Sequence, residues 1–174
     1  MFRYLLKVFC ILLITTTCAY ANSKNCNITK MYEDELKLSQ IIHEVSGKYN
    51  EDVHLVKAII RVESSFKPNA VSKNGSCKGA MQLSKATAKK FGVSNVFDAQ
   101  QNIEGGVRYL SHLRSIFGDD LVKIVASYNV GEGRVYKRSM PAEAKKYVNL
   151  VFAFRDKYEQ RDKETETETN VPEA

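Results

Sequence analysis

The sequence predicts an all-α fold, a single helical domain with at most a small β-hairpin. Apolar residues recur at the helical spacing i, i+3, i+4 in successive segments between residues 36 and 160. The apolar and polar alternation of a strand is absent, except in a brief stretch between Ala70 and Leu83. The chain has 174 residues, and about 153 follow residue 21. This length suits one domain with a sizeable core.

The first expected helix covers residues 36–49, and the second approaches its end near Phe66. Gly47 weakens or ends the first helix, because glycine loses more backbone freedom on folding than other residues do. Pro68 disfavours a helical conformation at Lys67, so the second helix is expected to stop just before it. We expect the two helices to pack together through their apolar faces. The apolar residues of the first are Leu38, Ile41, Ile42, Val45 and Tyr49.

Two further helices have recognisable residues at their ends. Ser84 is a suitable N-cap for a short helix that ends near Gly92. Pro141 is a favoured first residue for the last helix. The apolar positions of this last helix include Ala144, Tyr147, Val148, Val151, Phe152 and Tyr158.

A longer helix is expected between residues 103 and 117, followed by another that Asp119 or Asp120 caps. Gly118 stops the longer helix. Gly105 and Gly106 lie inside it, where each glycine costs about 1 kcal/mol against alanine. We therefore expect another backbone segment to approach the helix closely at these two positions. The next helix carries Leu121, Ile124, Val125 and Tyr128 on its apolar side.

Residues 1–21 have the features of a secretory signal peptide. Arg3 and Lys7 supply positive charge, a short apolar run follows, and an A-x-A cleavage site ends at Ala21. The apolar run is shorter than the about 20 residues that span a bilayer, so we expect no stable membrane span. Cys18 raises a lipoprotein alternative, which the preceding threonines disfavour. Cleavage near Ala21 predicts a periplasmic or secreted protein.

Four regions are therefore expected along the chain. Residues 1–21 form the signal peptide, 22–35 an N-terminal segment, 36–160 the helical domain and 161–174 an acidic disordered tail. The tail alternates glutamate with threonine and lacks apolar residues that could join a core.

The helical domain is distinctly basic. The whole chain has a net charge of +6, and loss of the two basic residues in 1–21 leaves +4. The four glutamates after residue 163 then leave +8 for residues 22–163. Such a charge suits nucleic acid, an anionic membrane surface or an acidic polymer. Export argues against nucleic acid, and solubility alone is a further explanation of the charge.

Cys26 and Cys77 are the only cysteines after residue 21, in a compartment that permits disulfides. A bridge between them would close a loop and reduce the entropy of the unfolded chain. In the chain-entropy model this stabilises the fold by about 4 kcal/mol. The alternative is two unrelated thiols.

Glu63 is a candidate general acid. With Val56, Ile59 and Ile60 it falls at i, i+3, i+4 and i+7, so a helix would place this carboxylate on its buried face. Its position in the last helical turn also puts it beside unpaired carbonyls and the negative end of the dipole. Desolvation and the dipole both raise the pKa of a carboxyl group, which lets Glu63 carry a proton near neutral pH. A solvated surface glutamate is the alternative.

Other chemistries have little support in the sequence. The histidines His43, His54 and His112 are widely spaced, and the segment after His43 lacks the second histidine of a zinc-protease helix. We therefore expect no metal site and no cofactor. Ser64 and Ser65 lie beside an acid and not within a nucleophile-elbow pattern, which argues against a serine hydrolase.

Four motif blocks follow one another along the chain. The first runs from Glu63 through E-S-S-F, P-N-A-V-S and Gly75 to G-A-M-Q-L at residues 79–83 and A-T-A at 86–88. The others are N-I-E-G-G-V-R-Y-L from residue 102, A-S-Y-N-V-G-E-G from residue 126, and the segment 141–148. In this order the blocks resemble the family 1 lytic transglycosylases, the catalytic domain of soluble lytic murein transglycosylase. The resemblance covers about residues 38–155.

The resemblance implies a compact lysozyme-like helical domain that acts on peptidoglycan glycan strands. It implies cleavage of the β-1,4 bond between N-acetylmuramic acid and N-acetylglucosamine, with formation of a 1,6-anhydromuramic end. It makes Glu63 the catalytic acid and base. The substrate-binding residues that it implies are Ser72, Met81, Gln82, Tyr128 and Asn129.

Core packing is the alternative role for Met81 and Tyr128, and helix capping for Asn129. At the level of function, a hydrolytic lysozyme and a non-catalytic glycan-binding assembly protein are the alternatives. We expect a monomer, with local opening of the wall for a secretion or conjugation apparatus as one setting.

The sequence departs from the family pattern in the loop after Glu63. The spacing from Gly75 to Gly79 is one residue longer than the usual one and contains Cys77. Lys85 replaces a common proline, and Ala80 a common leucine. These departures bear on fine subsite specificity and leave the reaction class unchanged.

Overall fold

The computed structural model of the protein describes residues 28–137 and 140–169. The chain divides into two compact units, and the boundary in the sequence lies between Lys37 and Leu38. In the first unit, residues 28–37 are helical, although the sequence indicated a helix only from residue 36. The expected signal peptide and Cys26 lie outside the described residues. All the elements labelled below belong to the second unit.

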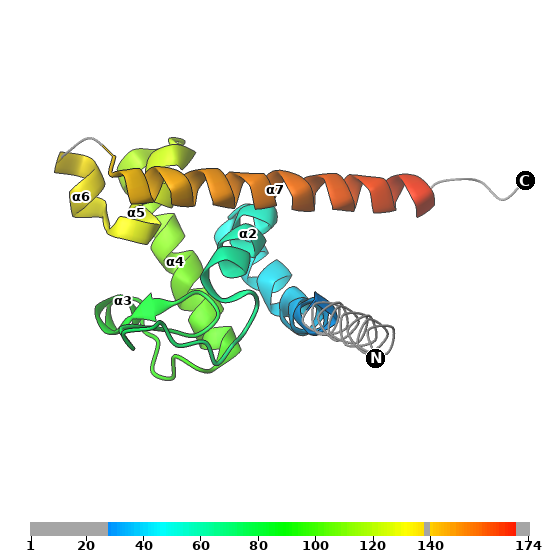
Figure 1. The fold of residues 1–174 in the computed structure, drawn as a ribbon, viewed down its shortest axis with the longest axis horizontal. Coiled ribbons are helices and arrows are strands. Elements are labelled where there is room, and N and C mark those ends of the chain that lie inside the picture. The colour runs from blue at the N-terminus through cyan, green and yellow to red at the C-terminus, as the bar shows by residue number, and fades with distance from the viewer. Residues whose placement is uncertain (1–27, 138–139, 170–174) are drawn as a thin grey trace, which may run out of the picture. The chain divides into compact units, whose positions relative to one another are not determined.

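The second unit is helical with a two-stranded antiparallel sheet, which confirms the predicted fold class (Figure 1). Residues 38–49 are helical and lead into the labelled elements. These are α2 (Val53–Ser64), β1 (Cys77–Lys78), β2 (Leu83–Ser84), α3 (Lys85–Lys90), α4 (Ala99–Phe117), α5 (Leu121–Val130), α6 (Glu132–Lys137) and α7 (Ala142–Thr169). In the sheet Cys77 pairs with Ser84, and Lys78 with Leu83. Among the described helices, none is both long and apolar enough to cross a membrane.

The core lies where α7 packs across α2 and α5, with α4 packed against α5 (Figure 1). The apolar stripes of the sequence face this core, and most of their members are buried because helical periodicity gathers them on one side. Fully buried examples from these helices are Ile59, Ile60, Ile103, Leu110, Ile124 and Val151.

The helix boundaries follow the capping residues closely. Ser84 accepts a hydrogen bond from the Thr87 amide and caps α3, as predicted. Asp120, one of the two candidates, caps α5 through the Lys123 amide, and Gly118 ends α4. The helix α7 starts at Ala142, one residue after Pro141. The short α6 has no clear apolar period and was not predicted.

The close approach at the paired glycines of α4 comes from side chains, and the expectation of a backbone neighbour was wrong. A Cβ on Gly105 would collide with the Val93 side chain. A Cβ on Gly106 would collide with the sulfur of Met81, which is fully buried. The two glycines therefore let the segment after Glu63 pack directly on α4.

The last helix extends further than the sequence indicated. A disordered tail was expected from residue 161, but α7 continues to Thr169. Contacts at i, i+4 accompany this extension, including the Lys163 Nζ to Glu159 Oε1 ion pair at 2.7 Å. The hydroxyl of Thr167 also donates to the Lys163 carbonyl. Residues 170–174 lie outside the described part of the chain.

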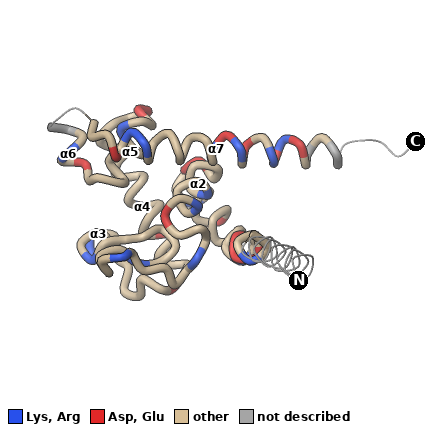
Figure 2. The backbone as a smooth tube through the Cα atoms, viewed as in Figure 1, with Lys and Arg blue, Asp and Glu red and all other residues tan. Residues whose placement is uncertain are grey.

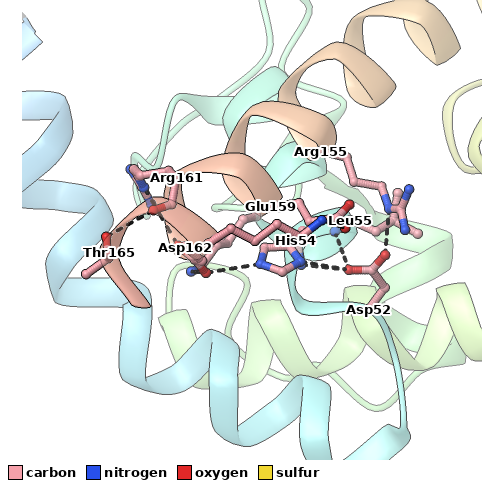
Figure 3. Close-up of polar contacts among 10 residues, drawn as sticks. Asp52, His54, Leu55, Arg155, Glu159, Arg161, Asp162 and Thr165 are labelled. Carbon is pink, nitrogen blue, oxygen red and sulfur yellow. Dashed lines mark hydrogen bonds and ion pairs between the residues drawn. The ribbon is translucent and has the colours of Figure 1, made fainter. Parts of the chain in front are cut away.

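A polar cluster joins the start of α2 to the middle of α7 (Figure 3). One oxygen of Asp52 accepts from the amides of His54 and Leu55 and so caps α2. The other accepts from Arg155 Nε at 2.6 Å, while His54 Nε2 lies 3.0 Å from an oxygen of Asp162. Burial raises the pKa of Asp52, but the hydrogen bonds from Arg155 and the two amides outweigh it and lower the pKa overall. This charged Asp52 thus holds α7 beside the helix that carries Glu63.

Candidate active site

Glu63 occupies the last turn of α2, on the side of the buried Ile59 and Ile60. The helix ends at Ser64, two residues before the predicted end at Phe66. Ser65 and Phe66 both adopt left-handed backbone angles, with φ of 53° and 64°, and turn the chain away from the helix axis. The fully buried Phe66 ring anchors this unusual turn. Glu63 is therefore presented at a sharp, well-anchored helix end.

The carboxyl group of Glu63 is set up to hold a proton near neutral pH. Burial raises its pKa from 4.5 to about 7, because the charged form loses solvation. A hydrogen bond from the Tyr147 hydroxyl to Oε1, 2.6 Å long, acts in the opposite direction by stabilising the carboxylate. A group with this pKa can donate a proton and take one back at the same pH.

A cavity of about 290 Å³ opens beside Glu63. Its walls come from the β1–β2 hairpin, α3, α4 and the end of α5. The residues that line it are Glu63, Cys77, Gln82, Leu83, Ser84, Thr87, Tyr109, Tyr128, Asn129 and Gly131. Among these described residues Glu63 is the only carboxylate, so the cavity combines one acid with amide, hydroxyl and aromatic groups.

Three of the five predicted substrate-binding residues line the cavity with Glu63, namely Gln82, Tyr128 and Asn129. Gln82 has a φ of 49°, and its side-chain amide donates to the carbonyls of Ala70 and Gly79. These bonds brace the hairpin that forms one wall. Asn129 is exposed at the end of α5, where its side chain is accessible to a ligand.

Tyr128 lies in the cavity wall without bonding to Glu63. Its hydroxyl donates to the carbonyl oxygen of Met81 at 2.9 Å. Its ring packs on the ring of Tyr109, with centroids 5.3 Å apart. Tyr128 therefore connects α5 to the hairpin segment and forms part of the cavity wall.

The other two predicted residues have structural surroundings. The side chain of Met81 is fully buried against Gly106, and its amide donates to Asn102 Oδ1. Ser72 Oγ donates to Asn74 and accepts from the Cys77 amide. Neither residue lines the cavity, so Met81 packs the core and Ser72 orders the loop before β1.

Tyr147 is the residue that sequence reasoning missed. It was assigned to the apolar stripe of the last helix, where its spacing from Ala144 and Val151 places it, and it is indeed buried, with 8% exposure. Burial raises the pKa of its hydroxyl well above 10, so the group stays protonated and donates to Glu63. The signal in the sequence was its place in the block 141–148, which gave no indication of its partner.

A second carboxylate is absent from the described lining of the cavity. Two other acidic residues, Asp98 and Glu104, make structural contacts outside this lining. Asp98 caps α4 through the Gln101 amide, and Glu104 accepts hydrogen bonds from Lys48 and Tyr49. Glycosidases that use two carboxylates hold them about 5 to 9.5 Å apart across the scissile bond. The cavity thus supports chemistry in which one acid acts alone.

Cys77 lies in β1 and lines the cavity close to Glu63. Within the described residues it carries a free thiol, whose sulfur is 3.7 Å from Ser76 Oγ. The proposed partner, Cys26, lies outside the described residues.

Comparison with known proteins places this geometry in context. Residues 40–151 match the family of the Transglycosylase SLT domain. Membrane-bound lytic murein transglycosylase F of Desulfosudis oleivorans is 38% identical over 112 residues, covering 61% of this chain and 24% of that protein. The Transglycosylase of Enterobacteria phage PRD1 is 35% identical over 116 residues, covering 65% of this chain and 43% of that protein. The chain thus spans less than half the length of these relatives.

Solved structures show the same fold. The lytic transglycosylase Slt of Pseudomonas aeruginosa, solved as an inactive glutamate-to-glutamine mutant, superposes with a TM-score of 0.62 and 26% identity. The match covers 71% of this chain and 24% of that one.

Proposed function

Because the chain belongs to the Transglycosylase SLT domain family, we propose that it is a peptidoglycan lytic transglycosylase. The proposed reaction breaks the β-1,4 bond between N-acetylmuramic acid and N-acetylglucosamine and leaves a 1,6-anhydromuramic end. The observation that carries the proposal is Glu63, a lone carboxylate with a pKa of about 7 on the wall of a polar cavity. The lytic activity in the names of the relatives is stated for those whole proteins. They extend well beyond the region that this chain matches.

The proposed mechanism uses Glu63 twice. Its protonated carboxyl gives a proton to the oxygen that leaves C1 of the muramic residue as the C1–O bond breaks. The substrate's own N-acetyl group assists at C1. Glu63, now ionised, accepts the proton of the C6 hydroxyl as O6 bonds to C1, which restores the starting enzyme without water. A tethered nucleophile has a large effective concentration, which removes the need for a second carboxylate.

The surroundings of Glu63 suit both half-reactions. The first needs a protonated acid, which burial favours, and the second begins from a carboxylate, which the Tyr147 hydrogen bond stabilises. Tyr147 also fixes the direction in which Oε1 points. We assign substrate contact to Gln82 and Asn129, whose side chains line the cavity with Glu63.

Product analysis tests the proposal. Purified glycan strands should give muropeptides with anhydro ends, each lighter by one water than the hydrolytic product, and Glu63→Gln should abolish their release while retaining the fold. The same kind of change, glutamate to glutamine, is present in the inactive mutant of the Pseudomonas aeruginosa enzyme. Products that end in reducing muramic acid would establish a hydrolytic lysozyme, and strands bound but uncut by wild-type protein would indicate an assembly protein.

We further propose that the protein acts in the periplasm or outside the cell as a monomer, after cleavage at Ala21. The charged segment followed by an apolar run and an A-x-A site supports export, and the basic charge of residues 22–163 suits an acidic wall polymer. A secretion or conjugation apparatus is the proposed setting. Amino-terminal sequencing of exported protein should begin at Asn22, and a start at Met1 would contradict the signal peptide.

A further inference from the structure

A second, larger cavity adjoins the one that holds Glu63. It measures about 1000 Å³ and lies between the hairpin, α3 and the segment 92–96. Leu83 and Ser84 line both cavities, so the two share a wall at β2. A ligand that enters the Glu63 cavity therefore has a neighbouring recess within reach.

Three lysines line this second cavity, and we call it the lysine groove. They are Lys78 on β1 and Lys85 and Lys89 on α3. The residues of the described structure that line it include no aspartate or glutamate, and α3 carries only basic charge (Figure 2). Apolar side chains such as Leu83, Val93 and Val96 complete the lining.

No carboxylate in the described lining of the lysine groove neutralises the charge of the three lysines. Lys85 and Lys89 are four residues apart on one helix face, a spacing at which like charges repel each other. In the described part of the chain neither they nor Lys78 forms an ion pair, whereas Lys90 on the same helix lies 3.8 Å from a Glu132 oxygen. Lys78 instead lies over the Phe97 ring, 5.9 Å from its centroid. An anionic ligand would relieve this repulsion.

We propose that the lysine groove binds the carboxylate groups of the peptide branches that glycan strands carry. This inference rests on the proposed function, because the branch is attached to the muramic residue whose bond would be cleaved beside Glu63. Its carboxylates match the three ammonium groups, and its short aliphatic side chains match the apolar lining. The shared wall at Leu83 and Ser84 lets one strand occupy both cavities.

The test compares strands with and without peptides in a background that cannot turn over. In Glu63→Gln protein, changing Lys78, Lys85 and Lys89 together to Gln should weaken binding of peptide-bearing strands about tenfold, since each exposed pair contributes modestly. Binding of strands stripped of peptide by an amidase should stay within about twofold. The peptide-dependent affinity should also shrink as salt rises.

A matched control removes the same charge elsewhere. Lys145, Lys146 and Lys157 are exposed on α7 and do not line either cavity, so their triple change to Gln should leave the peptide preference intact. Changing the three groove lysines to Arg should retain most of the affinity. If the triple Gln protein unfolds, the single Lys85→Glu change, at an exposed site, should reverse the preference for peptide-bearing strands.

Three results would overturn the inference. The first is equal loss of binding for both kinds of strand, and the second is equal loss in the α7 control. The third concerns phosphatidylcholine vesicles that contain phosphatidylglycerol. If binding to these vesicles depends on the groove lysines and binding to glycan strands does not, the groove belongs to a lipid surface. A separate experiment tests the proposed function. If wild-type protein releases no anhydro products from peptide-free strands, the proposed function is wrong.

Discussion

The hydroxyl of Tyr147 donates a 2.6 Å hydrogen bond to Oε1 of Glu63, a residue 84 positions earlier in the chain. The contact joins α7 to the end of α2 inside the packed core. It opposes the desolvation of Glu63, so the pKa of about 7 results from two competing effects. The first prediction follows from removing one of them.

Tyr147→Phe should raise the pKa of Glu63 further, because the hydrogen bond that stabilises its carboxylate is lost while burial remains. Turnover should fall about tenfold or more, since a hydrogen bond to a charged group is worth about 1.5 to 3 kcal/mol and the acid also loses its orientation. The measurement is turnover across pH 5 to 9, about two pH units on each side of the Glu63 pKa. The limb assigned to Glu63 should move to higher pH, and an unmoved limb would show that Tyr147 serves packing alone.

Glu63 should destabilise the folded protein at neutral and alkaline pH. Its folded pKa of about 7 lies above the usual 4.5, so the folded state binds the proton more tightly than the unfolded state. The favourable contribution is present below pH 4.5 and is lost as pH rises through 7. Glu63→Gln should therefore raise the free energy of unfolding by about 1 to 3 kcal/mol at pH 8 and much less at pH 4.

Thermal unfolding of both proteins at the two pH values checks this prediction. An equal difference in Tm at both pH values would mean that the Glu63 carboxyl is not desolvated in solution.

Tyr128→Phe should lower the stability of the folded protein. Its hydroxyl bonds to the Met81 carbonyl and not to Glu63, so the change removes a tie between α5 and the hairpin. The expected cost is about 1 kcal/mol of unfolding free energy, with a smaller loss of turnover than Tyr147→Phe causes. Turnover and unfolding should be measured on one preparation, and a large loss of turnover at unchanged Tm would place the hydroxyl on the substrate.

Gly106→Ala should destabilise the protein because its Cβ would collide with the buried Met81 sulfur. The expected loss is about 1 to 3 kcal/mol, typical of overpacking a core. Gly133→Ala is the matched control, since nothing lies within 4 Å of a Cβ there, and alanine favours its helix. Chemical denaturation of both variants decides the matter, and equal midpoints would contradict the close packing of α4 on the Met81 segment.

Protein recovered from an oxidising compartment should contain the Cys26 to Cys77 disulfide. The loop closure would stabilise the fold by about 4 kcal/mol in the chain-entropy model. Mass spectrometry after alkylation without reduction should find neither thiol modified, and reduction should release both. Recovery of two alkylated cysteines from unreduced, denatured protein would refute the bridge.

Local sequence determined the helices and the acid. Short-range contacts specify the helices, through the apolar stripes, the caps Ser84 and Asp120 and the stop at Gly118. The sequence therefore predicted these helices directly. The same periodicity placed Glu63 on a buried face, from which its raised pKa follows. What the sequence indicated less well were features with no local signal, including α6 and the helical extension to Thr169.

Tertiary structure alone decided which groups meet across the core. The periodicity that placed Tyr147 in the apolar stripe could not show that its hydroxyl reaches Glu63, because a helix face specifies burial and not a partner. The burial of the Met81 side chain likewise depends on α4, where Gly106 leaves room for it. The grouping of Lys78 with Lys85 and Lys89 depends in the same way on β2, which pairs with β1 and packs against α3. Many pairs of residues have the same local conformational preferences, and long-range packing decides which of these pairs come into contact. Such contacts are therefore determined only when the chain has folded.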